Sequence, residues 1–353
     1  MVGESAGFVS RVVSYTSPNT PGPDGAGRLP GWMLLVCCVG NFDGVHLGHQ
    51  ALIRRAREVA DSTPGTRVIA MVFDPHPFSR VAPERTPARL SLYEQRRDWL
   101  LGAGADEAER LDPASGVLER TPEEFVDMLA RRGVLAMVEG ADFRFGARRA
   151  GDADALLRLG RARGMRVEIL QPVHVALGDC TVVRASSTML RWLVSNGRVG
   201  DAKRVAGRAY EAVGTVVRGD RMGRELGYPT ANVETPCLPP ADGVYAGRGE
   251  LPDGRIVVAA ISVGRKPTFD SDHRFVEAYF VGVDREASGA ISGLPEYGWP
   301  VRLSFDSFIR EQARFGSAGA LVSQIERDVE RVCDMLGRDH AITGVSEPVG
   351  AAS

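Results

Sequence analysis

The chain has 353 residues, of which 43 are basic and 45 are acidic, so its formal net charge is −2. This balance argues against a protein that coats nucleic acid or an anionic membrane, and the length predicts about two domains. Five cysteines without a C-x-x-C pair fit neither a disulfide scaffold nor a zinc site. No secretory signal and no membrane-spanning run is recognisable, so a cytoplasmic protein is expected.

Only two of the basic residues, Lys203 and Lys266, are lysines. Because no lysine follows a glycine, the G-x-x-x-x-G-K-[ST] loop of P-loop nucleotide hydrolases is absent. Phosphate chemistry is therefore expected to depend on arginine, histidine, backbone N–H groups or a metal ion.

The first part of the chain passes from a lead-in containing Pro, Gly and Ser to alternating strands and helices. Residues 1–32 are expected to be a flexible tail. From residue 33, apolar runs alternate with helical stretches, which predicts an α/β domain over 33–205 with a parallel sheet. The expected strands are 33–39, 68–73, 135–139 and 167–170, and the expected helices include 47–61 and one that begins at a Thr121–Glu124 capping box and ends at Gly133.

After residue 206 the pattern becomes one of short strands rich in Val, Ile, Tyr and Phe, separated by turn residues. This pattern predicts a small closed antiparallel β-barrel over 206–340. Apolar residues at helical spacing predict a final helix over 318–336, and 341–353 is expected to be a second tail. The expected strands are 213–218, 243–248, 256–263, 275–283 and 301–308.

The sequence Asn-Phe-Asp-Gly-Val-His-Leu-Gly-His, residues 41–49, lies where the first strand passes into the first helix. His46 and His49 share one helix face, and Gly44 and Gly48 leave room for a phosphate chain beside the backbone. The helix N-terminus adds unpaired N–H groups and a positive dipole end. Two imidazoles there can stabilise the charge that develops during phosphoryl transfer. A strand–helix turn capped by two histidines is the simpler alternative.

A second candidate phosphate site is the hydroxyl-rich segment Ser186, Ser187 and Thr188, which precedes Arg191. The three hydroxyls open a helix that is expected to end at Gly197. Arg191, one turn into that helix, can hold phosphate oxygens with its fork of N–H donors. Helix capping alone is the alternative.

Three further polar residues of this domain are candidates for substrate binding. His76 lies between two prolines, and Asp142 and Arg144 lie in a loop after an expected strand. The alternatives are a rigid turn residue for His76 and solvated loop charges for the other two.

A glycine-rich segment, residues 219–232, follows the first expected barrel strand. Its three glycines recur every four residues, which indicates a flexible loop rather than a helix face. The segment ends in Pro-Thr-Ala-Asn, so Thr230 and Asn232 present oxygens that can seat Mg²⁺ beside nucleotide phosphates. A plain glycine hairpin is the alternative.

Residues 41–49 resemble the adenylyltransferase module of the bacterial bifunctional riboflavin kinase/FMN adenylyltransferase (FAD synthetase) family. Three further segments resemble the same family. They are Phe73-Asp-Pro-His-Pro, Gly140-Ala-Asp-Phe-Arg-Phe-Gly with Arg149-Ala-Gly-Asp, and Ser186-Ser-Thr-Met-Leu-Arg. The resemblance implies a Rossmann-like nucleotidylyltransferase fold that adenylylates FMN, with His46, His49 and Arg191 as catalytic residues. It implies that ATP is bound by Asn41, Gly44, His46, His49, Ser186, Ser187, Thr188 and Arg191, and FMN by His76, Asp142 and Arg144.

Residues 219–232 resemble the G-D-x-x-G-R-x-L-G-x-P-T-A-N motif of riboflavin kinase, and Gly243-Val-Tyr and Val263-Gly-Arg-Lys-Pro-Thr-Phe resemble two further segments. The resemblance implies a kinase barrel in which Glu277 is the general base and Mg²⁺ lies at Thr230 and Asn232. It implies that ATP is bound by Gly219, Asp220, Gly223, Gly227, Pro229, Thr230 and Asn232. Riboflavin, FMN, FAD and ATP would be the substrates and products, and no nucleic-acid or membrane partner is expected.

The kinase half departs from the family pattern at several places. Lys266 stands where arginine is usual, Glu277 is followed by Ala-Tyr-Phe, and residues 284–296 replace a tighter turn with a longer loop. Two alternatives follow: a relative that acts on a modified flavin or retains only adenylyl transfer, and a flavin-binding protein without turnover.

Overall fold

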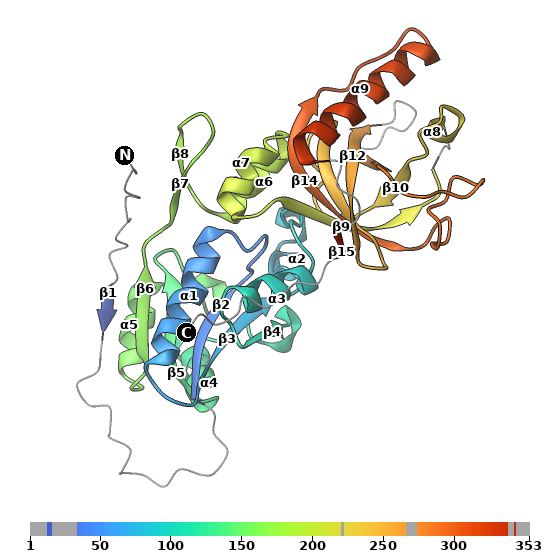
Figure 1. Ribbon diagram of the computed structural model, residues 1–353. Coiled ribbons are helices and arrows are strands. Elements are labelled where there is room, and N and C mark those ends of the chain that lie inside the picture. Colours follow the sequence, from blue (N-terminus) through green and yellow to red (C-terminus); the bar gives the residue numbers. More distant parts are fainter. Residues whose placement is uncertain (1–12, 16–33, 220–221, 266–273, 338–341, 344–353) are drawn as a thin grey trace, which may run out of the picture. The chain divides into compact units, whose positions relative to one another are not determined.

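The computed structural model describes residues 13–15, 34–219, 222–265, 274–337 and 342–343 (Figure 1). The chain divides into two compact units. The first contains the described residues up to Pro87, Tyr93–Val175 and Val182–Ser187, and the second contains Ala88–Leu92, Ala176–Thr181 and the described residues from Thr188 onward. The limits expected for the two family modules, 33–205 and 206–340, stay predictions, as does the tail over 1–32, of which the structure describes one short strand.

The first unit is built on a six-stranded sheet in the order β1-β6-β5-β2-β3-β4, in which all neighbouring strands are parallel except β1 and β6. Its strands are β1 (Val13–Tyr15), β2 (Leu34–Gly40), β3 (Thr66–Phe73), β4 (Glu107–Leu111), β5 (Val134–Gly140) and β6 (Arg166–Leu170). Its helices are α1 (Leu47–Asp61), α2 (Phe78–Val81), α3 (Tyr93–Gly102), α4 (Pro122–Arg131) and α5 (Ala153–Arg161), with short 3-10 turns at Pro83–Arg85, Pro113–Ser115 and Ala147–Arg149.

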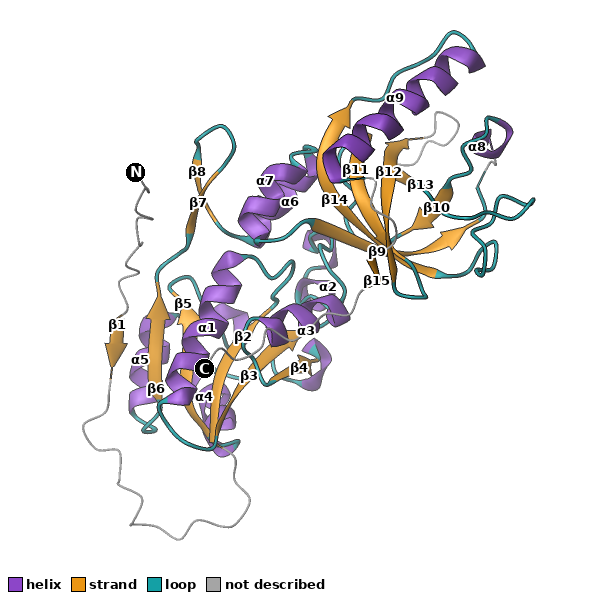
Figure 2. Ribbon diagram, viewed as in Figure 1, coloured by secondary structure: helices purple, strands orange, loops and turns teal. Residues whose placement is uncertain are grey.

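Helices cover both faces of this sheet (Figure 2). Successive residues of β2 point into opposite cores: Val36 and Cys38 pack with residues of α1 and α3, whereas Cys37 and Val39 pack with residues of α4 and α5. Burial on both faces explains why the strands are almost continuously apolar in sequence. The predicted parallel α/β fold is confirmed.

The second unit contains a closed barrel of six antiparallel strands in the order β11-β14-β9-β10-β13-β12, which pairing of β11 with β12 closes. Its strands are β9 (Tyr210–Val217), β10 (Ala231–Glu234), β11 (Gly243–Glu250), β12 (Arg255–Arg265), β13 (Arg274–Phe280) and β14 (Pro300–Arg310), and β15 (Ile342–Thr343) pairs with β12. A Cβ at Gly247 would overlap the backbone oxygen of Ser304, so the close approach of β11 and β14 requires glycine there.

The long helix α9 (Ala318–Leu336) has the limits predicted from the sequence and packs on the barrel. Ser317 caps its N-terminus by accepting the N–H of Ala320 at 3.2 Å. The guanidinium of Arg310 on β14 donates to the buried carboxylate of Asp328 at 2.6 Å, and Val332 lies in a core cluster with Val244. The predicted antiparallel barrel with a C-terminal helix is confirmed.

Three helices connect the two parts of the sequence or lie in the barrel loops: α6 (Ser187–Ser195), α7 (Val199–Ala206) and α8 (Met222–Glu225). Two short strands, β7 (His174–Ala176) and β8 (Val182–Arg184), form a sheet of their own. None of the described helices has the length and apolar character that are needed to cross a bilayer.

Six of the described strands were not predicted from the sequence: β1, β4, β7, β8, β10 and β15. β4 was not predicted because Glu107, Glu109 and Arg110 interrupt its apolar residues. β10 was not predicted because it begins inside the Pro-Thr-Ala-Asn sequence, which is typical of a turn. The strand expected over 275–283 ends earlier, at Phe280.

Candidate active sites

The loop between β2 and α1 has an unusual backbone. Phe42 has φ 48°, Gly44 has φ 78° and Val45 has φ 33°. A positive φ at a β-branched residue such as Val45 is rare and costs on the order of 1–3 kcal/mol. The side chains of Phe42 and Val45 are fully buried in the core beneath α1, which holds the loop in this conformation. Strain that packing maintains in this way is common at active sites.

The two histidines of the loop lie against each other, as their spacing predicted. The ring centroids of His46 and His49 are 3.7 Å apart with an interplanar angle of 24°. His46 is the N-cap of α1, and its Nδ1 accepts the backbone N–H of His49 at 3.4 Å. Because Nδ1 is an acceptor, a neutral His46 carries its proton on Nε2, where it can be donated to a ligand.

The chain segment that precedes α6 contacts the same loop. A Cβ at Gly48 would lie 3.0 Å from the His46 imidazole and 3.3 Å from the backbone oxygen of Ala185. The hydroxyl of Ser187 donates to the backbone oxygen of Asp43 at 2.7 Å. The structure therefore brings the beginning of the hydroxyl-rich segment to the histidine loop, and Gly48 is the residue that permits this approach.

The other residues of that segment are assigned to different units. Ser186 lies in the first unit, whereas Thr188 and Arg191 lie in the second. Nε of Arg191 donates to the backbone oxygen of Ala88 at 2.7 Å, within that second unit.

A buried arginine that the sequence analysis missed joins the ends of β2 and β3. Arg96 on α3 is 4% exposed and donates to the backbone oxygens of Asn41 and Phe73, at 2.9 and 3.0 Å. It also pairs with the carboxylate of Asp74 at 2.5 Å. Arg96 lies in a helix with several charged residues, and nothing in the sequence distinguishes it as the arginine of this helix that is buried.

His76 lies beside Asn41, so two predicted site residues are neighbours. Nδ1 of His76 accepts the N–H of Phe78 at 3.1 Å, and Nε2 lies 3.1 Å from Nδ2 of the Asn41 amide. An amide nitrogen only donates, so Asn41 donates to an unprotonated Nε2, and accepts from a protonated Nε2 only when its amide is turned over.

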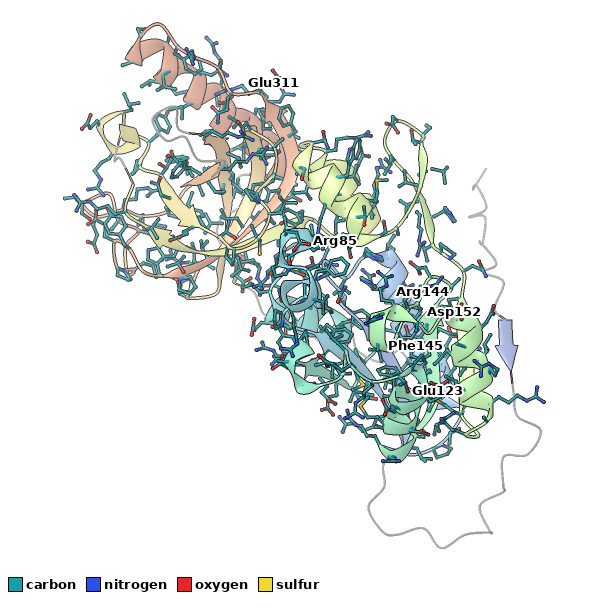
Figure 3. The ribbon with its side chains drawn as sticks, turned by 180° about the vertical axis from the view of Figure 1, so that it is seen from behind. Arg85, Glu123, Arg144, Phe145, Asp152 and Glu311 are labelled. Atoms are coloured by element: carbon teal, nitrogen blue, oxygen red, sulfur yellow. The ribbon has the colours of Figure 1, made fainter. Side chains whose placement is uncertain are left out.

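Asp142 and Arg144 are exposed residues of the loop after β5. Asp142 forms an ion pair with Arg184 at 2.6 Å, and Arg144 donates to the backbone oxygen of Phe143. The loop itself is tightly built: Phe145 pairs with Gly151 across a β-bridge, and the next residue, Asp152, caps α5 (Figure 3).

A buried carboxyl group supports β2 immediately before the histidine loop. The N–H of Val39 donates to Oε1 of Glu139 at 2.7 Å, where the ladder between β2 and β5 has ended. Glu139 is 2% exposed, and its burial raises the pKa of its carboxyl group well above the ordinary value, with Asp142 adding to the effect. The protonated form of Glu139 is therefore favoured over the charged form in the folded protein, compared with an exposed glutamate.

In the barrel, the glycines of the 219–232 segment make close contacts. A Cβ at Gly219 would overlap the side chain of Asn232, and one at Gly223 would overlap the backbone oxygen of Tyr228 and lie 3.3 Å from Oγ1 of Thr230. Gly227 has φ 81°, which favours glycine. Asp220 and Lys266 lie outside the described residues.

The barrel brings the Pro-Thr-Ala-Asn sequence to Glu277. In the pairing of β10 with β13, Asn232 lies opposite Glu277, and Oγ1 of Thr230 is 3.5 Å from Oε2 of Glu277. A hydroxyl, an amide and a carboxylate thus converge on one small area. Their hard oxygens fit Mg²⁺ that also binds phosphate oxygens and water, rather than a site made of protein ligands alone. Within the described residues, no group of three or more His, Cys, Asp or Glu side chains is arranged to hold a metal.

A pocket opens over this area. One wall is the glycine-rich segment with Pro229, Thr230 and Asn232, and the other wall comes from residues 285–299. Arg224 of α8 reaches that second wall by an ion pair with Glu296 at 2.6 Å, and the Tyr297 hydroxyl donates to the same carboxylate at 2.9 Å.

Both units thus carry sites typical of enzymes that transfer phosphate-containing groups from a nucleotide. The family model described as FAD synthetase matches residues 32–183, and the model described as riboflavin kinase matches residues 206–336. The chain belongs to the family of bifunctional riboflavin kinase/FMN adenylyltransferases, which confirms the resemblance seen in the sequence.

Individual relatives cover nearly the whole fold. The bifunctional riboflavin kinase/FMN adenylyltransferase of Pseudomonas fluorescens is 33% identical over 298 residues, which cover 83% of this chain and 90% of that protein. That of Escherichia coli K12 is 32% identical over 302 residues, with the same coverage. A solved structure described as a macrolide-efflux protein from Streptococcus pneumoniae is similar with a TM-score of 0.73 and 28% identity, covering 85% of this chain and 93% of that chain.

Proposed function

We propose that this chain makes FAD from riboflavin in two ATP-dependent steps: the barrel unit phosphorylates riboflavin to FMN, and the α/β unit adenylylates FMN. The observation that carries the proposal is that the family matches for both activities occur in one chain. The five cysteines are free, which fits the reducing cytoplasm that we propose as the enzyme's location.

For adenylyl transfer, we assign the chemistry to the histidine loop. An oxygen of the FMN phosphate attacks the α-phosphorus of ATP in line, a new P–O bond forms, and pyrophosphate leaves as the old P–O bond breaks. His46 and His49 stabilise the charge on the transferring group and on pyrophosphate, His46 through its Nε2 proton. Asn41 and the hydroxyls of Ser186 and Ser187 are supporting ATP ligands, and the loop glycine Gly44 lets the phosphates approach the backbone.

The remaining predicted residues of this half complete the assignment. Thr188 and Arg191 bind the triphosphate, with the guanidinium of Arg191 supplying a fork of N–H donors to phosphate oxygens. FMN is held by the half-buried His76 and by Asp142 and Arg144, whose side chains are exposed.

For the kinase step, we assign Glu277 as the general base. Its carboxylate takes the proton of the ribityl 5′-hydroxyl as that oxygen attacks the γ-phosphorus of ATP, and ADP leaves. The 3.5 Å separation between Thr230 Oγ1 and Glu277 Oε2 supports this assignment. It puts the proposed base beside a proposed ligand of the ATP phosphates, so both can act on the same bound substrates. Thr230 and Asn232 would hold Mg²⁺, which neutralises phosphate charge, and Gly219, Gly223 and their neighbours would receive the phosphates.

The test is a pair of reactions with the purified full chain, analysed by HPLC. With riboflavin, ATP and Mg²⁺, we expect FMN and then FAD; with FMN in place of riboflavin, we expect FAD and pyrophosphate. Product from FMN alone would favour the alternative that retains only adenylyl transfer. Flavin binding without ATP consumption in either reaction would favour a binding protein.

A substitution tests the assignment of the base. Glu277→Gln should lower the rate of FMN formation by about 100-fold or more and leave FAD formation from FMN unchanged. Glu250→Gln is the matched control, because Glu250 is an exposed barrel carboxylate that pairs with Arg302 at 3.3 Å. Unchanged FMN formation in Glu277→Gln would refute the assignment.

A further inference from the structure

The second wall of the barrel pocket contains a buried donor with no acceptor. Trp299 lines the pocket and is 5% exposed, and within the described residues its indole Nε1 has no hydrogen-bond partner. An indole N–H can only donate, and leaving such a group buried without an acceptor costs on the order of 1–3 kcal/mol. If this wall served only for packing, an aromatic side chain without an N–H group would avoid the cost of the unpaired donor.

The backbone holds Trp299 firmly in this position. Its carbonyl oxygen accepts the N–H of Val216 at 2.9 Å, and the N–H of Gly298 donates to the Val216 oxygen at 2.8 Å. These bonds tie the backbone of the segment to β9, so the Cα atom of Trp299 cannot move away from the pocket without breaking them. The ring of Phe280 packs 6.3 Å from the indole ring and also lines the pocket.

The same wall contains a cation without a carboxylate partner. Arg285 is half-buried, donates to the backbone oxygens of Phe280 and Gly289 at 3.1 and 3.2 Å, and lies over the Tyr279 ring at 5.4 Å. Among the described residues it forms no ion pair, in contrast to Arg224, whose charge Glu296 balances. Burial lowers the pKa of the Arg285 guanidinium, so the local environment disfavours its charge. A bound anion would reverse that penalty.

We propose that Trp299 and Arg285 bind ATP in the kinase pocket, with the indole N–H donating to an acceptor atom of the nucleotide and the guanidinium pairing with its negative charge. This inference rests on the proposed kinase function. A nucleoside triphosphate supplies both an excess of acceptors and an excess of negative charge, whereas riboflavin supplies acceptors but no negative charge to pair with Arg285. The opposite wall already presents the glycine-rich segment, so both walls contact one ligand.

These residues lie in the part of the chain where the sequence departs from the family pattern. Residues 284–296 form a longer loop that ends just before Trp299. If Arg285 and Trp299 bind ATP, the departures change how ATP is held, and we expect them to change the KM for ATP.

The first experiment compares steady-state kinetics of full-length variants. Trp299→Phe keeps an aromatic ring and removes the N–H, and Arg285→Gln keeps the length and removes the charge. We expect the KM for ATP in riboflavin phosphorylation to rise about 10-fold in each, with the KM for riboflavin within twofold of the parent value. Trp192→Phe and Arg302→Gln are the matched controls, because Trp192 is 51% exposed and Arg302 lies outside the pocket. A KM for ATP within twofold in both pocket variants, or a rise in the KM for riboflavin instead, would overturn the proposal.

A second measurement uses the unmodified protein, so it does not depend on the folding of the pocket variants. The chain has four tryptophans, Trp32, Trp99, Trp192 and Trp299, and their indole N–H resonances can be assigned by replacing the first three singly with Phe. Adding Mg²⁺ with β,γ-imido-ATP should move the Trp299 resonance downfield and slow its exchange with solvent; an unchanged resonance would refute the contact. A shift in a protein that does not phosphorylate riboflavin would uphold the nucleotide site and reject the kinase function.

Discussion

Replacing Glu139 by glutamine should change how the stability of the α/β unit depends on pH. Burial raises the pKa of this carboxyl group in the folded protein, and this effect exceeds the opposite effect of the hydrogen bond from the Val39 N–H. Glutamine has the same shape and its amide oxygen can accept the same 2.7 Å hydrogen bond. The substitution therefore removes the titration and keeps the contact.

The sign follows from proton uptake. In the unfolded chain a glutamate has a pKa of about 4.3, so above that pH the unfolded state loses the proton while the folded state retains it. Stability is fully present below about pH 4.3 and decreases as the pH rises toward the folded pKa, by up to about 1.4 kcal/mol per pH unit. The glutamine variant lacks this decrease. The difference in unfolding free energy, Glu139→Gln minus parent, should therefore grow more positive from pH 5 to pH 8.

The assay is hydrogen exchange of the β2 and β5 amides in the full chain, read as opening free energies at several pH values and corrected for intrinsic exchange rates. Glu107→Gln is the matched control, because Glu107 lies on the same sheet but is exposed and pairs with Arg67 at 3.4 Å. A free-energy difference between Glu139→Gln and the parent that stays constant across this pH range would refute the reasoning, since the carboxyl would then titrate alike in both states.

Four further substitutions have defined outcomes. His49→Ala should lower the rate of FAD formation from FMN by about 100-fold or more, with FMN formation from riboflavin, measured in the same sample, as the control. Gly48→Ala should lower adenylyl transfer by displacing the His46 ring, which a changed His46 resonance would report. Gly247→Ala should destabilise the barrel by at least about 1–3 kcal/mol in urea unfolding. Ser317→Ala should cost about 1 kcal/mol, seen as faster amide exchange in the first turn of α9; unchanged exchange there would contradict the cap.

Features that repeat along the chain were predictable from the sequence. The helices 47–61 and 318–336 were predicted with their observed limits, because apolar residues recur at helical spacing and the ends carry recognisable signals. The Thr121 capping box is present with both of its reciprocal hydrogen bonds. The stacking of His46 on His49 followed from their three-residue spacing at a helix start.

Features that depend on contacts between distant segments were not predictable in this way. Arg96 lies in a helix with several charged residues, and only the packing of α3 against β2 and β3 selects it for burial. Glu139 ends an apolar strand, where a charged residue usually marks the surface, yet the end of the β2–β5 ladder provides it with a backbone donor. Trp299 follows a turn, and its unpaired N–H is evident only once the barrel has closed around it.

The division of the chain into two units has a consequence for synthesis on the ribosome. Segment 88–92 belongs to the second unit, where the Arg89 oxygen accepts the N–H of Leu238 and the Ala88 oxygen accepts Nε of Arg191. Leu238 is made on the order of 150 residues after Arg89, which at about 5–20 residues per second is a delay of roughly 10–30 s. During that time the segment leaves the ribosome without its partners, so the nascent α/β unit exposes one piece of the barrel unit until the barrel follows. A barrel fragment that begins at residue 206 would lack both segment 88–92 and Arg191, so the kinase unit produced on its own would expose the surface that this segment covers.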